Sequence, residues 1–126
     1  MTGDRGCVLV VDDQEDARTS LAEILRIEGY RVAAAADGQE ALEYLRSHPS
    51  PNVILLDLMM PGMNGWEFRR RQLADPATAP IPVAVISGAD LSEQNQSLLQ
   101  AVGHFVKPLQ IERVLETVAA CCGTGA

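Results

Sequence analysis

Five polar residues follow short apolar runs of the sequence. They are Asp12 and Asp13 after "CVLVV", Asp57 after "NVILL", Ser87 after "IPVAVI" and Lys107 after "HFV". A single aspartate after such a run is most often a turn former or a helix cap. Three carboxylates at one place, however, repel one another, and a bound divalent cation or a nearby ammonium group would relieve that cost. The residues therefore predict a cation site if the fold brings them together.

The donor atoms at these positions favour magnesium. All-oxygen ligation suits Mg²⁺, which takes one or two carboxylates from the protein and keeps several waters. Asp13 and Asp57, with a loop carbonyl such as that of Met59, would be adequate ligands. The absence of Cys and His at these positions argues against zinc. A carboxylate beside Mg²⁺, a lysine and a hydroxyl also meets the needs of phosphoryl transfer, with an aspartate as the nucleophile.

The apolar runs predict strands that are covered on both faces. Their β-branched residues are continuous rather than alternating, as in a parallel sheet, and a further run, "RVAAA" (31–35), lies between the first two. Helical spacing fills the intervals. Its positions are Ala17, Leu21, Ile24, Leu25 and Glu28 before Gly29, then Ala41, Leu42 and Leu45, and near the end Ile111, Leu115, Val118, Ala119 and Cys122. The segments "DGQE" (37–40) and "NGWE" (64–67) predict capping boxes at two helix starts, and "DLSE" (90–93) introduces a polar fourth helix.

Strands alternating with helices in this way predict an α/β fold of the (βα)5 type. Right-handed crossovers then give a doubly wound parallel sheet with helices on both faces. Ligands of such sheets bind beyond the carboxyl ends of the strands, where the polar residues above are expected. We interpret residues 1–126 as a single domain with its core at about 7–120, and "GTGA" (123–126) as a short flexible end.

Composition excludes several classes of function. The net charge of −7 disfavours a nucleic-acid groove, since phosphates would be repelled. No apolar run approaches the roughly 18 residues that span a bilayer, and the N-terminus lacks a secretory signal, so we expect a soluble cytoplasmic protein without a membrane partner. Cys7, Cys121 and Cys122 are expected to be small core or helix-end residues. The run from Arg69 to Arg71 is expected on a solvated helix face, with a docking patch as the alternative.

Four motifs resemble, in order, those of the receiver domain of two-component response regulators. They are "VVDDQ", "LLDLMMPGMNG", "VIS" and "VKP". The resemblance covers about residues 7–120, as in a stand-alone regulator, and it implies a flavodoxin-like sheet of strand order 2-1-3-4-5. It also implies that Asp57 accepts a phosphoryl group from the phosphohistidine of a sensor histidine kinase or a histidine phosphotransfer protein. Asp12, Asp13 and Asp57 would hold Mg²⁺ together with the backbone carbonyl of Met59.

The same resemblance implies supporting roles for other residues. Lys107 would pair with the phosphoryl group, and the peptide bond before Pro108 is expected to be cis. Ser87 takes the place of the hydroxyl that moves toward the phosphoryl oxygens on activation. Pro61 and Gly65 match the loop that shapes the acceptor site.

Three positions depart from the family's pattern. His104 stands where the family usually has a rotating Tyr or Phe. It is either a tolerated, partly exposed residue or a switch whose imidazole makes the output face sensitive to pH. Met59 and Ala89 would flank the phosphoryl group, and neither side chain hydrogen-bonds water effectively. We therefore expect slower self-dephosphorylation than in a relative with polar residues there.

The expected function is that of a phosphorelay signalling domain, not of an enzyme, although the domain would assist its own Mg²⁺-dependent phosphorylation and dephosphorylation. The face of the fourth helix, fifth strand and fifth helix would switch and dock an unknown downstream protein, without direct contact to nucleic acid. The domain would act as a monomer or a phosphorylation-dependent dimer. The alternative is a docking module of the same fold that works without phosphorylation. A phosphatase that works through aspartyl phosphate would carry Asp-x-Asp after its first strand. A flavin binder would carry Ser or Thr together with Gly where this chain has two acids.

Overall fold

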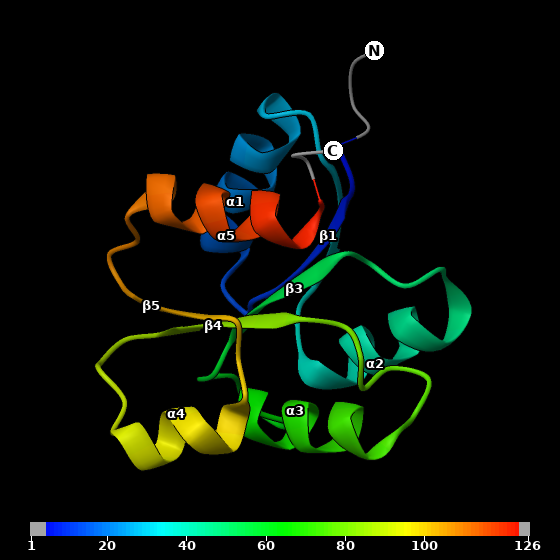
Figure 1. The fold of residues 1–126 in the computed structure, drawn as a ribbon, viewed down its shortest axis with the longest axis vertical. Helices are drawn as coiled ribbons and strands as arrows, with labels where there is room; N and C mark the ends of the chain where they lie inside the picture. The colour runs from blue at the N-terminus through cyan, green and yellow to red at the C-terminus, as the bar shows by residue number, and fades with distance from the viewer. Residues whose placement is uncertain (1–4, 124–126) are drawn as a thin grey trace.

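Five strands form one parallel sheet in the order β2-β1-β3-β4-β5 (Figure 1). The strands are β1 (Cys7–Val11), β2 (Arg31–Ala35), β3 (Val53–Asp57), β4 (Val83–Ser87) and β5 (Gly103–Val106). The helices are α1 (Glu15–Ile27), α2 (Gly38–Ser47), α3 (Gly65–Ala74), α4 (Glu93–Leu99) and α5 (Ile111–Cys121). This computed structural model describes residues 5–123, so residues 124–126 of the predicted flexible end lie outside it. The predicted (βα)5 fold and strand order are confirmed, and none of the helices within residues 5–123 is long and apolar enough to cross a membrane.

The sheet separates two apolar cores. α1 and α5 cover one face, and α2, α3 and α4 cover the other (Figure 1). Successive strand residues point to opposite faces, so Leu55 packs with α1 and α5, whereas Ile54 and Leu56 pack with the other three helices. β3 and β4 are buried at every position because both of their faces carry helices. This is the burial on both faces that the continuous apolar runs predicted.

Two helix starts agree with the predicted capping boxes only in part. The side chain of Asp37 accepts a hydrogen bond from the Glu40 amide at 2.8 Å, and that of Asn64 accepts one from the Glu67 amide at 3.0 Å. The reciprocal bonds differ from the prediction. Glu40 accepts from the Ala36 amide, one residue before the cap, and Glu67 pairs with arginines instead. Each helix start is thus capped by the side chain of its N-cap residue, whereas the glutamate three positions later bonds to a donor other than the N-cap amide.

The arginine run is where the sequence prediction is wrong. Arg69 is only 5% exposed and lies on the buried face of α3. Arg70 and Arg71 are exposed as expected, and they pair with Glu67 at 2.6 and 2.7 Å, which lowers the pKa of that carboxyl to about 2. A run of charges predicts a solvated face because water usually satisfies each charged group, and this rule does not hold for Arg69. Backbone carbonyls and a glutamine side chain satisfy its guanidinium instead.

The cysteines behave as packing residues. Cys7, Cys121 and Cys122 are free and partly buried, and the last two pack with the core of α1 and α5. Burial raises the pKa of the Cys121 and Cys122 thiols, which lowers the fraction of thiolate at neutral pH. The predicted apolar stripe on α5 omitted Val114. This residue is fully buried and lies three positions, or about one helical turn, after Ile111.

The cap at Asp37 tests how local sequence stabilises the fold. We expect Asp37→Ala to lower the free energy of unfolding by about 1 kcal/mol, because the Glu40 amide loses its acceptor. Urea denaturation followed by circular dichroism measures the change. Gln110→Ala is the matched control, since Gln110 precedes α5 without a side-chain cap bond, and it should alter stability by less than about 0.5 kcal/mol. Equal losses in the two variants would contradict the assigned cap.

Candidate functional site

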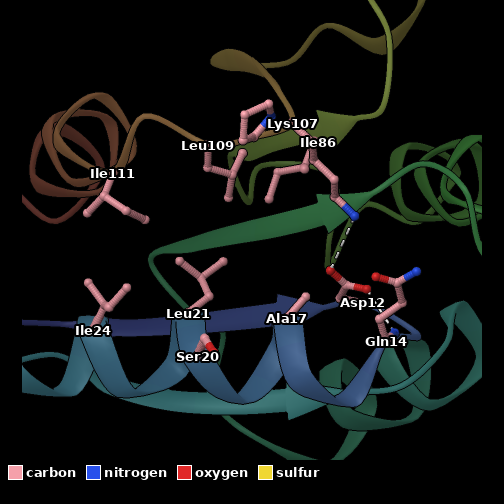
Figure 2. A pocket seen from close by; sticks show the side chains of 11 residues that line it. Asp12, Gln14, Ala17, Ser20, Leu21, Ile24, Ile86, Lys107, Leu109 and Ile111 are labelled. Atoms are coloured by element: carbon pink, nitrogen blue, oxygen red, sulfur yellow. Dashed lines mark hydrogen bonds and ion pairs between the residues drawn. The ribbon is translucent and has the colours of Figure 1, made fainter.

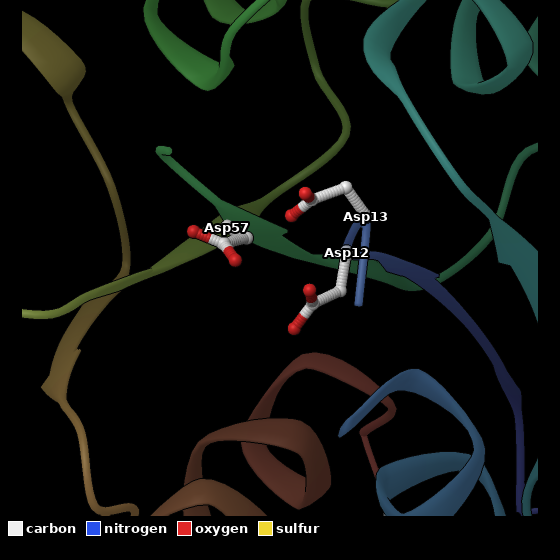
Figure 3. Close-up of side chains that lie close together, drawn as sticks. All are labelled: Asp12, Asp13 and Asp57. Carbon is white, nitrogen blue, oxygen red and sulfur yellow. The ribbon is translucent and has the colours of Figure 1, made fainter. Parts of the chain in front are cut away.

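Three carboxylates meet at the carboxyl edge of the sheet. β1 and β3 are neighbouring parallel strands with Val11 beside Leu56, so the residues that follow, Asp12 and Asp57, leave the sheet side by side. One oxygen each of Asp12, Asp13 and Asp57 lies within 4.8 Å of the others (Figure 3). Asp12 and Asp57 are buried, whereas Asp13 is exposed. A cluster of hard oxygen donors that opens to solvent on one side fits the predicted magnesium ion.

The buried carboxylate of Asp57 has a partner on each oxygen. Its Oδ1 accepts the Met59 amide at 2.9 Å, and its Oδ2 lies 3.2 Å from the Lys107 Nζ. The same ammonium lies 3.9 Å from Asp12 Oδ2, as the dashed line in Figure 2 shows. Lys107 directly follows β5 and is joined to Pro108 by the cis peptide bond that the family resemblance implied. One ammonium thus serves two carboxylates that leave different strands.

The pKa of Asp12 reflects both its burial and the negative charge close to it. Burial raises the pKa of its carboxyl, and the negative charge of Asp57 adds to this effect. The Gln14 amide, which donates to Asp12 Oδ1 at 2.9 Å, and the Lys107 ammonium act in the opposite direction. The pKa stays raised on balance, so the ionised site carries a cost that a bound cation would offset.

The loop after β3 brings the backbone close to Asp57. Gly65 has no room for a side chain, because a Cβ there would lie 2.7 Å from the Asp57 carbonyl oxygen. Pro61 lies on the exposed part of this loop. Met59 is 72% exposed, while its amide holds the carboxylate. The side chain that the family resemblance places beside the expected phosphoryl group is therefore open to solvent.

Ser87 and His104 form a contact that the sequence did not predict. The Ser87 Oγ lies 2.6 Å from the Ala89 carbonyl oxygen and 3.0 Å from the His104 Nε2. A hydroxyl has one proton, which the short bond to Ala89 takes, so the imidazole Nε2 must donate to the serine oxygen. The contact depends on the register that places Val85 beside His104. β4 is buried at every position, so its sequence has no alternation of apolar and polar residues from which this register could be predicted. Among the described residues, the hydroxyl thus bonds to the segment leading to α4 and to β5, not to the acidic cluster.

Comparison with known proteins identifies the arrangement. A family model of the response regulator receiver domain matches residues 8–119. The chain belongs to this family. It is 33% identical over 112 residues to sporulation initiation phosphotransferase F of Bacillus subtilis, a match that covers 88% of this chain and 89% of that protein. The receiver domain is also similar to longer proteins: it is 43% identical over 104 residues to response regulator PleD of Caulobacter vibrioides, covering 81% of this chain and 23% of PleD.

Solved structures agree with the family assignment. The chemotaxis response regulator CheY4 of Vibrio cholerae matches with a TM-score of 0.82 at 31% identity, covering 91% of this chain and 97% of CheY4. Receiver domains are signalling modules of two-component systems, not enzymes in the usual sense. Membership of this family accounts for the gathering of polar residues at the carboxyl edge of a sheet whose central strands are apolar.

The raised pKa of Asp12 predicts how the stability of this receiver domain depends on pH. Between the ordinary value of 3.8 and its raised folded value, the folded state binds more protons than the unfolded state, so ionisation of Asp12 lowers stability as the pH rises. We expect Asp12→Asn, whose amide oxygen still accepts the Gln14 amide, to be more stable than the wild type near pH 7 in EDTA. The advantage should shrink toward zero as the pH falls below 3.8.

Urea denaturation across this pH range measures the effect. Adding Mg²⁺ should raise the stability of the wild type more than that of the variant, because a ligand stabilises the state that binds it. A variant that is no more stable than the wild type near pH 7 in EDTA would contradict the expected cost of the buried carboxylate.

Proposed function

We propose that this receiver domain accepts a phosphoryl group on Asp57 from a phosphohistidine, with Mg²⁺ bound beside it. The supporting observation is the position of the buried Asp57 carboxylate, 3.2 Å from the Lys107 ammonium and within a cluster of carboxylate oxygens. An Asp57 oxygen forms a bond to phosphorus while the bond from phosphorus to the donor imidazole nitrogen breaks. The products are an acyl phosphate and the free histidine of the donor.

The chain's own residues divide the work of this transfer. Asp12, Asp13, Asp57 and the Met59 carbonyl would hold Mg²⁺, which neutralises phosphoryl oxygens when bound. Lys107 exchanges its bond to Asp57 for one to a phosphoryl oxygen, so its charge stays paired throughout. In this way the domain assists its own phosphorylation and, when water attacks, its own dephosphorylation.

Activation passes through Ser87 in this proposal. To reach a phosphoryl oxygen, its hydroxyl must give up the bond to the Ala89 carbonyl, and the contact with His104 changes with it. The segment between β4 and α4 then moves, and the face of α4, β5 and α5 changes for a downstream protein. His104 is the proposed switch residue on that face, because its imidazole bonds to the hydroxyl that moves.

The proposed partners follow from the chemistry of the site. The donor is a sensor histidine kinase or a histidine phosphotransfer protein, and the receiver of the signal is a protein that docks on the changed face. We propose a cytoplasmic domain spanning residues 1–126, as a monomer or a phosphorylation-dependent dimer. A docking module that works without phosphorylation is the alternative, but it has no use for an ammonium shared between two buried carboxylates.

Mass spectrometry of the intact protein tests the proposed acceptor. With acetyl phosphate and Mg²⁺, we expect the wild type to gain one phosphoryl group, because Asp57 is the nucleophile beside Lys107. Asp57→Asn should gain none, and Asp75→Asn, which changes an exposed aspartate after α3, should gain one as the wild type does. Chelation of Mg²⁺ should slow the gain by at least about a hundredfold, since several kcal/mol of charge stabilisation are lost. A wild type that gains no phosphoryl group would favour the docking alternative.

The lifetime of the acyl phosphate tests the role of Met59. Its side chain is 72% exposed beside the acceptor and offers water only a weak sulfur acceptor. We expect Met59→Asn to speed the decay about tenfold, because one hydrogen bond to the attacking water is worth ~1.4 kcal/mol in the transition state. The decay is followed by intact mass after acetyl phosphate is removed. Met59→Leu, which stays apolar, should decay like the wild type, and an unchanged rate in Met59→Asn would rule this role out.

A further inference from the structure

Arg69 is a buried cation that pairs with neutral groups. Its Nε donates to the Leu99 carbonyl oxygen at 2.8 Å, its Nη2 to the Gln100 carbonyl oxygen at 2.9 Å, and its Nη1 to the Gln72 Oε1 at 2.8 Å. Within residues 5–123, no carboxylate forms an ion pair with it. Burying such a charge is costly unless its donors are satisfied. Solubility and surface charge therefore do not explain why an arginine is buried at position 69.

The two carbonyls that Arg69 binds are those at the C-terminal end of α4. Leu99 is the last residue of that helix, and Gln100 caps it in the left-handed conformation with φ of 50°. The last carbonyls of a helix have no partner within the helix, and they carry partial negative charge. A guanidinium donates to both at once and so fixes the direction in which the helix ends.

The rest of α4 packs weakly against the protein. Leu99 is the only buried residue of its seven, and Leu98 is 69% exposed. Leu91, before the helix, is half-buried against the core. Gly88 has open space around it and directly follows Ser87. The side chain of Leu99 and the guanidinium of Arg69 thus hold the same end of α4, whereas the other end connects to the hydroxyl at the site.

Arg69 itself is rigidly supported. Gln72 is fully buried, and its Nε2 donates to the carbonyl oxygens of Thr78 and Ile81, both at 2.9 Å. The Thr78 hydroxyl donates to the Gln72 carbonyl oxygen at 2.8 Å. These bonds tie α3 to the connection that leads into β4. Polar networks in which every member is satisfied stiffen a core, so the anchor for α4 belongs to the fixed part of the fold.

We propose that Arg69 is the positioning residue about which α4 turns when Asp57 is phosphorylated. It holds the C-terminal end of the helix still, so the motion that begins at Ser87 appears at the N-terminal end. The proposal rests on the proposed function for its trigger, and on the buried network alone for its pivot. Without Arg69 the whole segment would loosen, and the signal would no longer have a defined direction.

Hydrogen exchange with mass spectrometry on the full chain tests this pivot. In the wild type, acetyl phosphate and Mg²⁺ should change exchange in residues 88–96 and leave residues 97–102 unchanged. Arg69→Met should speed exchange in residues 97–102 at least about tenfold before phosphorylation, and the response to phosphorylation should then spread to them. Arg70→Met is the matched control, since it removes an exposed arginine from the same helix, and it should respond like the wild type.

The pattern of response separates a pivot from a merely structural role. A general loss of stability would speed exchange in β1 and β3 as well, whereas loss of the pivot changes only which end of α4 responds. If Arg69→Met does not fold, Arg69→Lys replaces it. An ammonium keeps the charge but lacks the planar fork that reaches both carbonyls, so its response should also spread to residues 97–102.

Three results would overturn the pivot. They are an Arg69 variant that matches Arg70→Met, a wild type in which both ends of α4 respond equally, and loosening that extends to the whole sheet. A wild type that gains no phosphoryl group in the intact mass would count against the proposed function instead. In that case faster exchange of residues 97–102 in the unphosphorylated variant still supports the anchor, and unchanged exchange overturns it.

Discussion

The burial of two carboxylates side by side is the constraint on which the rest of this structure depends. Asp57 is 3% exposed and lies beside the buried Asp12, so each negative charge raises the cost of the other. The fold meets this cost with the Met59 amide, the Lys107 ammonium and an open side at Asp13. These groups follow β1, β3 and β5, and β4 lies between the last two, so the site needs these four neighbouring strands to be paired. The site therefore forms only when this part of the sheet has formed.

The same balance of charge makes the site able to respond. Lys107 lies 3.2 Å from Asp57 and 3.9 Å from Asp12, so its charge is shared rather than committed to one partner. A typical hydrogen bond contributes only about 1 kcal/mol net, because water offers a substitute. Coupling between distant sites is usually about 1–3 kcal/mol. If Asp57 gains a phosphoryl group as proposed, the bonds of Ser87 to Ala89 and His104 are therefore weak enough to be exchanged.

The sequence was most informative where a residue's position follows from chain order and burial alone. Continuous apolar runs located the strands, and the rule for carboxyl ends then placed Asp12, Asp57 and Lys107 at one edge. The contact between Ser87 and His104 depends on strand register, which the continuous apolar run of β4 does not reveal because it lacks alternation. The burial of Arg69 depends on carbonyls thirty positions later in the chain, at the end of another helix. A prediction based on charge alone places a charged side chain in water. It fails for Arg69 because protein groups accept the hydrogen bonds of its guanidinium.

The two cations Lys107 and Arg69 show how one fold separates a part that responds from a part that does not. Lys107 is partly exposed and pairs with carboxylates, so a change of charge at Asp57 acts on it directly. Arg69 is buried and bonds to neutral oxygens, and it makes no ion pair with the carboxylates of the site. The chain between β4 and Lys107 carries α4, whose C-terminal end is the part that Arg69 holds. In the proposed mechanism, a charge added at the site would move one end of this segment while Arg69 holds the other.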